Sequence, residues 1–119
     1  MRLREALPEF VEEIVESLTC SGRPELATQV DSLDLASRCG CGDDFCSTFY
    51  VTSGRSPLSP DERKERGPHF RDTLDLDAKS GSVLIDLDHL DRIVTVEVLN
   101  RPDVEEALKV AIERMRQAP

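Results

Sequence analysis

The stretch Ser82-Val-Leu-Ile-Asp-Leu-Asp-His-Leu-Asp-Arg-Ile-Val-Thr-Val-Glu-Val-Leu99 decides the fold of this chain. Aliphatic residues occupy alternate positions in both of its halves: Val83, Ile85, Leu87, Val94, Val96 and Val98. This alternation predicts two β-strands, and the short turn from His89 to Arg92 permits only an antiparallel connection between them. Ile93 and Leu99 add apolar groups to the other face of the second strand. We therefore expect that strand to be central and covered on both sides.

Three more strands are expected before this stretch. Alternating apolar residues over 70–76 predict a strand that the turn Lys79-Ser-Gly-Ser82 joins to the next one, which gives a meander. Leu33 and Leu35 alternate with polar neighbours up to residue 38, and residues 46–52 are rich in β-branched and aromatic types. Gly40-Cys-Gly-Asp-Asp44 lies between these two segments and is dense in turn-forming residues. The pair therefore predicts a hairpin with cysteines at its tip.

Helical patterns flank the strands at both ends of the chain. Apolar residues over 7–20 recur at helical spacing with glutamates between them, and a short helical turn is expected over 25–30. A last helix begins at Pro102, with acidic residues in its first turn and basic residues toward its end. The pattern predicts a single α+β domain over residues 1–119. Its antiparallel sheet of about five strands, a hairpin plus a meander, is packed by an N-terminal helical hairpin and a C-terminal helix. The polar segment 54–68 is expected to be a long mobile loop.

Charge and composition exclude some classes of function. The chain has 119 residues and a formal charge of −9, so its surface repels phosphate backbones and gives little attraction to anionic membranes. No segment approaches membrane-spanning length, and the N-terminus lacks the apolar region of a signal peptide. We therefore expect a cytoplasmic protein with reduced thiols that binds neither nucleic acid nor membrane. The acidity suits a basic protein partner, although it also serves solubility.

Three of the four cysteines fall within eight residues, in Cys39-Gly-Cys41-Gly-Asp-Asp-Phe-Cys46. Thiolates brought together by glycine-rich spacers suit a soft cation such as zinc. A structural zinc site needs four ligands, and Cys20 or His69 is the candidate for the fourth. The sequence thus predicts a structural or regulatory zinc site at the hairpin tip.

Other interpretations of the same residues remain open. The cysteines could be reduced thiols that fill the core as small apolar groups, or Cys46 could resolve a sulfenate formed on Cys41 in a thiol-redox protein. Pairing a thiol with His69 or His89 would suit nucleophilic catalysis, but nothing in the sequence brings them together. Aspartates at 72, 75, 86 and 88 are expected on the solvent face of strands rather than in an acid–base pair.

Residues 39–50 and 83–102 together resemble small uncharacterised proteins of actinobacteria and similar bacteria. The cysteine segment is the more specific part of this resemblance. The resemblance implies a bacterial, cytoplasmic protein and transfers no catalytic residue. We therefore expect a small protein that is not an enzyme and carries a possible zinc site. The alternatives are an acidic protein-binding module, of the immunity or accessory type, and a thiol-redox protein.

Overall fold

A five-stranded antiparallel sheet forms the centre of the computed structural model, which describes residues 1–52, 72–88 and 91–117. Its strands are β1 (Asp34–Arg38), β2 (Phe49–Thr52), β3 (Asp72–Leu76), β4 (Ser82–Leu87) and β5 (Ile93–Leu99). They lie in the order β1-β2-β5-β4-β3, and every neighbouring pair is antiparallel. The predicted hairpin and meander are both confirmed. They join where β2 pairs with β5, with Phe49 opposite Val96.

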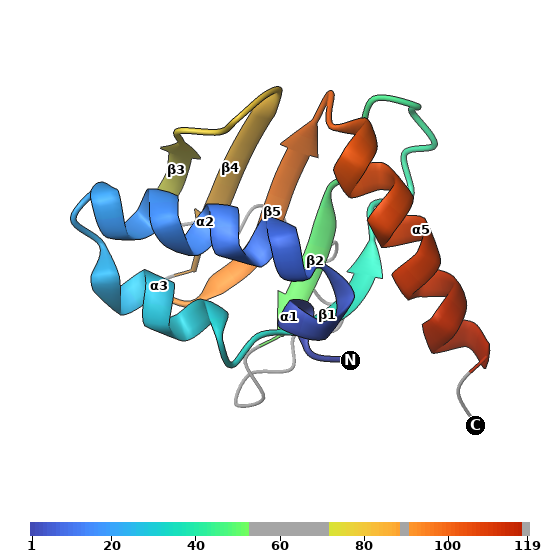
Figure 1. Cartoon of the computed structure of the whole chain (residues 1–119), viewed down its shortest axis with the longest axis horizontal. Helices are drawn as coiled ribbons and strands as arrows, with labels where there is room; N and C mark the ends of the chain where they lie inside the picture. Colours follow the sequence, from blue (N-terminus) through green and yellow to red (C-terminus); the bar gives the residue numbers. More distant parts are fainter. Residues whose placement is uncertain (53–71, 89–90, 118–119) are drawn as a thin grey trace.

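The four helices of the described residues all cover one face of this sheet (Figure 1). They are α1 (Leu3–Ala6), α2 (Pro8–Cys20), α3 (Pro24–Val30) and α5 (Pro102–Gln117). The helices α2 and α3 form the predicted N-terminal helical hairpin, and α5 lies beside β1 (Figure 1). The predicted α+β class is therefore confirmed.

The core lies between the helices and the sheet. Its centre is the ring of Phe49 on β2, fully buried and in edge-on contact with Phe10 of α2 at a centroid distance of 6.3 Å. Aliphatic side chains of α2, α5 and the central strands fill the rest, which suits a chain with no tryptophan and only four phenylalanines. The largest fully buried aliphatic side chains include Leu3, Leu7, Ile14, Leu18, Leu26, Leu33, Ile85, Leu87, Ile93 and Leu108.

The prediction that β5 is the central strand is confirmed. The predicted cover on both of its sides is not found among the described residues, whose helices all lie on one face of the sheet (Figure 1), and the predicted direction of Ile93 is wrong. Ile93 lies opposite Leu87, whose side chain points into the core, and is itself 1% exposed. A shift of register between Asp86 and Leu87 rotates this end of β5 toward the helices. Simple alternation along the strand could not reveal that shift.

The expected exposure of the strand aspartates is half right. Asp72 and Asp75 are exposed, whereas Asp86 and Asp88 of the central region are only 1% and 6% exposed. Asp86 accepts a hydrogen bond of 2.8 Å from the hydroxyl of Thr73 on β3, and Asp88 pairs with Arg92 at 2.7 Å. These contacts offset part of the cost of burying the two carboxylates.

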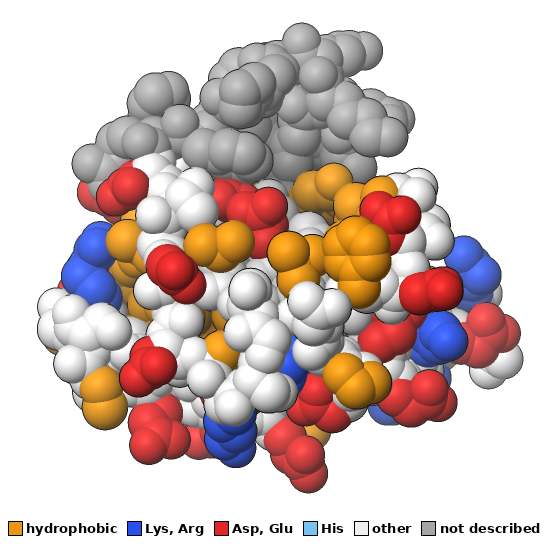
Figure 2. All heavy atoms as spheres, turned by 90° about the horizontal axis from the view of Figure 1, so that it is seen from above, with side chains coloured by type: hydrophobic (Ala, Val, Ile, Leu, Met, Phe, Trp, Pro, Cys, Tyr) orange, Lys and Arg blue, Asp and Glu red, His pale blue; other side chains and the backbone are white. Residues whose placement is uncertain are grey.

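The predicted loop over 54–68 and the candidate ligand His69 lie outside the described residues. Among the residues that are described, no helix is long and apolar enough to cross a membrane. On the face shown in Figure 2, acidic side chains are spread over the surface and outnumber the basic ones. This distribution agrees with the net charge of −9.

Candidate metal centre

The sulfur atoms of Cys39, Cys41 and Cys46 all lie within 4.8 Å of one another. Cys39 directly follows β1, and Cys46 lies in the connection that leads to β2, so the hairpin brings the two ends of the segment together. All four cysteines of the chain are free thiols. Cys46 is buried, Cys39 is half-buried and Cys41 is exposed, so the cluster opens to solvent on the Cys41 side.

Backbone hydrogen bonds fix the shape of this connection. The Cys39 N–H donates to Thr48 O at 2.8 Å and closes the base of the loop, and the Cys46 N–H donates to Asp43 O at 3.1 Å inside it. Gly42 has φ +76°, a left-handed conformation that glycine adopts without strain. This local sequence therefore explains how the loop turns tightly enough to gather three thiols.

The end of β5 holds the same loop from outside. Ser47 N–H donates to Val98 O at 2.8 Å, and Asn100 N–H donates to Phe45 O at 2.8 Å. Cys46 itself forms a β-bridge with Leu99. The central strand of the sheet and the residue after it therefore anchor the loop that carries the cluster.

The hydrogen bonds around the sulfur atoms give the thiols unequal acidity. Burial alone would raise the pKa of the Cys46 thiol, but hydrogen bonds from the Thr48 hydroxyl, the Thr48 backbone N–H and the two neighbouring thiols lower it below its usual value. The Thr48 hydroxyl is oriented for this because its oxygen already accepts a hydrogen bond of 3.1 Å from Val98 N–H. A hydrogen bond from the Asp43 backbone N–H lowers the pKa of the Cys41 thiol. The hydrogen bond between Cys41 and Cys46, the partial desolvation of Cys41 and the neighbouring Cys39 outweigh this effect and raise the pKa of Cys41 to about 11.

A cation accompanies the thiols. The Arg38 guanidinium lies close enough to attract the thiolates of Cys46 and Cys41, although its main partner is the carboxylate of Glu105 on α5. Hydrogen bonds to Glu105 raise the pKa of Arg38, and attraction to the two thiolates adds to the effect. A positive charge beside a cysteine favours the thiolate, which is the form that binds metals.

The structure separates the predicted ligands into one group of three and two others. Cys20 is exposed and is the last residue of α2. That end of α2 lies on the β3 side of the molecule, whereas the β1–β2 connection lies beside the first turns of α5 (Figure 1). Cys20 is therefore not brought to the cluster, and His69 lies outside the described residues. Within the described part of the chain, these three cysteines are the only group of metal-ligating side chains so close together.

Sequence reasoning missed three residues that support the cluster. Thr48 follows Cys46 by two residues, and Arg38 directly precedes Cys39, so both were visible beside the motif. Glu105 is 66 positions after Cys39 in the numbering and carries no sequence signal of its own. Only the packing of α5 against β1 brings its carboxylate to the base of the loop.

Comparisons of the chain with protein-family models, with curated protein sequences and with solved structures found no match in any of the three. The resemblance of residues 39–50 and 83–102 to a bacterial family stays a prediction. The arrangement of the thiols is therefore the observation on which a function for this chain is proposed.

Proposed function

We propose that Cys39, Cys41 and Cys46 form a zinc site with a structural or regulatory role in a protein that is not an enzyme. The observation that supports this proposal is the approach of the three sulfur atoms to within 4.8 Å of one another. Tetrahedral zinc with sulfur at about 2.3 Å separates its ligands by roughly 3.8 Å, so only a small adjustment is required. Thiolates select zinc or another soft ion over magnesium and calcium.

The unequal acidity of the thiols indicates the order in which they would bind the ion. Cys46 has the lowered pKa and is the natural first ligand, whereas Cys41 stays protonated until the ion displaces its proton. Zinc would therefore release protons on binding, and its affinity would increase with pH. His69, a water molecule or a group from a partner would complete a tetrahedral site.

Elemental analysis of protein purified without chelator tests the proposal. About one zinc per chain is expected, lost on the single substitution Cys41→Ser, which also lowers the melting temperature of the zinc-loaded protein. Cys20→Ser is the matched control, because Cys20 is an exposed thiol outside the cluster. His69→Ala tests whether His69 is the fourth ligand, and His89→Ala, which changes the other histidine of the chain, is its control.

The outcome that would contradict the zinc site is defined by metal content, thiol reactivity and melting temperature. Metal-free protein in which all four thiols react, and in which Cys41→Ser leaves the melting temperature unchanged, would exclude the zinc site. A peroxide that then oxidised Cys41 to a sulfenic acid, releasing water or an alcohol, would support the thiol-redox alternative. Cys46 would complete that step by forming a disulfide with Cys41 and releasing water. The acidic protein-binding module stays a prediction, tested by salt-sensitive binding to basic proteins.

A further inference from the structure

One carboxylate on α5 holds both ends of the cysteine segment. Arg38, which precedes Cys39, donates to the two oxygens of Glu105 from its two terminal nitrogens, at 2.9 Å and 3.0 Å. Ser47, which follows Cys46, donates its hydroxyl hydrogen to Glu105 Oε2 at 2.7 Å. The segment from 39 to 46 is thus closed at its base by a residue from a different part of the chain.

The same guanidinium also reaches the backbone of a ligand. Arg38 Nη2 donates to the carbonyl oxygen of Cys46 at 3.1 Å while it pairs with Glu105. A bidentate ion pair fixes the plane of a guanidinium, so the remaining hydrogen bond is fixed as well. Glu105 therefore sets the position of the Cys46 backbone through Arg38.

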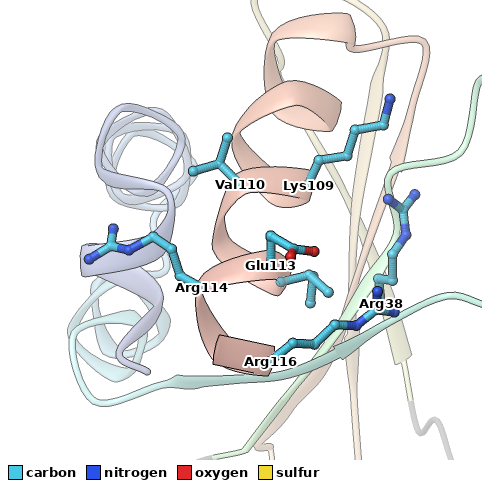
Figure 3. A pocket seen from close by; sticks show the side chains of 7 residues that line it. Arg38, Lys109, Val110, Glu113, Arg114 and Arg116 are labelled. Atoms are coloured by element: carbon cyan, nitrogen blue, oxygen red, sulfur yellow. The ribbon is translucent and has the colours of Figure 1, made fainter. Parts of the chain in front are cut away.

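The environment of Glu105 keeps this contact in place. Its side chain is 19% exposed and that of Arg38 is 29% exposed, so both are partly shielded from water. Lys109, one helical turn further on, attracts the same carboxylate, and hydrogen bonds from Arg38 lower the pKa of Glu105. Arg38 extends along the side of α5 that also carries Lys109, where the two line an open groove with a volume of about 520 Å³ (Figure 3).

We infer that Glu105 is a positioning residue of the cysteine cluster, which holds Cys39 and Cys46 at metal-binding distance through Arg38 and Ser47. The spacing of the thiols depends only on the contacts described above, whereas the effect on zinc affinity also rests on the proposed function. Groups that orient metal ligands from outside the coordination sphere contribute to affinity in just this way.

The coupling works in both directions. If the docking of α5 onto Arg38 and Ser47 strengthens zinc binding, zinc must strengthen the docking of α5 by the same factor. Zinc is therefore expected to slow amide hydrogen exchange in the first turns of α5. The same amides in Glu105→Ala should respond less to zinc.

The first test measures zinc affinity by competition with a chromophoric chelator. Glu105→Ala is expected to bind zinc about 10- to 100-fold more weakly than the unchanged protein, the usual range for such supporting residues. Glu105→Gln retains one oxygen acceptor and should lie between the two. Glu106→Gln is the matched control, because Glu106 is the exposed neighbour on the same helix. Circular dichroism establishes that each variant is folded at the temperature used.

A second probe separates this inference from the zinc proposal. Phenylarsine oxide bonds to two thiols held close together, and its binding to zinc-free protein reports their spacing alone. Tight binding by the unchanged protein and weaker binding by Glu105→Ala would support the positioning role even if no zinc were found. Equal binding of both the arsenical and zinc by Glu105→Ala and the unchanged protein would overturn it, as would failure of the unchanged protein to bind the arsenical.

Discussion

Removing the Glu13 side chain should destabilise the protein more than any change to its surface charges. Arg101, which directly precedes α5, donates to both carboxylate oxygens of Glu13 on α2, at 2.7 Å and 2.8 Å. The two side chains are 3% and 8% exposed for Arg101 and Glu13 respectively, so the pair is buried. Glu13 also accepts a hydrogen bond of 3.2 Å from the Lys79 backbone N–H. The pair therefore links α2, α5 and the turn between β3 and β4.

The size of the effect follows from what Glu13→Ala leaves behind. Arg101 would keep the carboxylate of Asp103, whose side chain is 65% exposed, a hydrogen bond of 3.3 Å to Ser80 O, and the face of the Phe10 ring at 5.5 Å. Of these groups only the Asp103 carboxylate is charged, and it is exposed to water. Breaking a buried ion pair from one side costs about 3–5 kcal/mol, because an uncompensated charge remains in the interior. We expect Glu13→Ala to lower the free energy of unfolding by that amount. The double variant Glu13→Leu, Arg101→Met should lose much less than the two single changes together.

Urea denaturation followed by far-ultraviolet circular dichroism suits this measurement, because the chain has no tryptophan and a single tyrosine. Glu9→Ala, an exposed glutamate on the same helix, is the control and should change stability by no more than about 0.5 kcal/mol. Hydrogen bonds from Arg101 lower the pKa of Glu13 below its ordinary value of 4.5. The stabilisation is therefore present above that value and disappears as the pH falls through the lowered pKa.

A small loss of unfolding free energy in Glu13→Ala would refute this reasoning. If Glu13→Ala at pH 7 lost less than about 1 kcal/mol, Arg101 would have to be solvated or paired elsewhere, against the range for a broken buried pair. A difference between Glu13→Gln and the unchanged protein that persisted undiminished at pH 2.5 would also contradict it, since the ionised carboxylate would then play no part.

Two further changes have defined outcomes. Gly81→Ala should destabilise the fold by more than about 2 kcal/mol, because Gly81 has φ +65° and an added Cβ would lie 2.3 Å from Leu99 O and 2.8 Å from Asn100 O. Thermal melting measures this loss, and a variant that melts with the unchanged protein would show that β4 and β5 can separate there at little cost. Burial and the neighbouring Asp86 carboxylate raise the pKa of Glu97, so its ionised form destabilises the native state as the pH rises through that raised pKa. Glu97→Gln should therefore increase stability at pH 8 by about 0.5–1 kcal/mol, a gain that shrinks toward pH 4. Urea titrations at several pH values test this, and equal gains at all of them would argue against the carboxylate pair.

The sequence determined the elements of the fold because their patterns are local. Apolar residues alternate over 83–98 and recur at helical spacing over 7–20 because one side of each element faces the core. These patterns can be recognised without knowing which other element packs against that side. The reduced cluster was visible for a similar reason, since Cys39 to Cys46 is one short, glycine-rich segment. The register shift that turns Ile93 toward the core left no such pattern.

Tertiary structure alone decided the contacts between distant charged residues. Glu13 occupies an ordinary position among the glutamates of α2, yet it is buried because α5 brings Arg101 over it. Glu105 likewise lies in the first turn of α5, where the favourable interaction of acidic residues with the helix dipole is enough to account for a glutamate. Only the packing of α5 places its carboxylate against Arg38. Cys20 is the opposite case. The sequence made it a candidate ligand beside the other three cysteines, but it lies at the C-terminal end of α2, away from the cluster. Which charged residues pair with one another depends on how distant segments pack together. Such pairs leave no repeating pattern in the sequence, so only the tertiary structure reveals them.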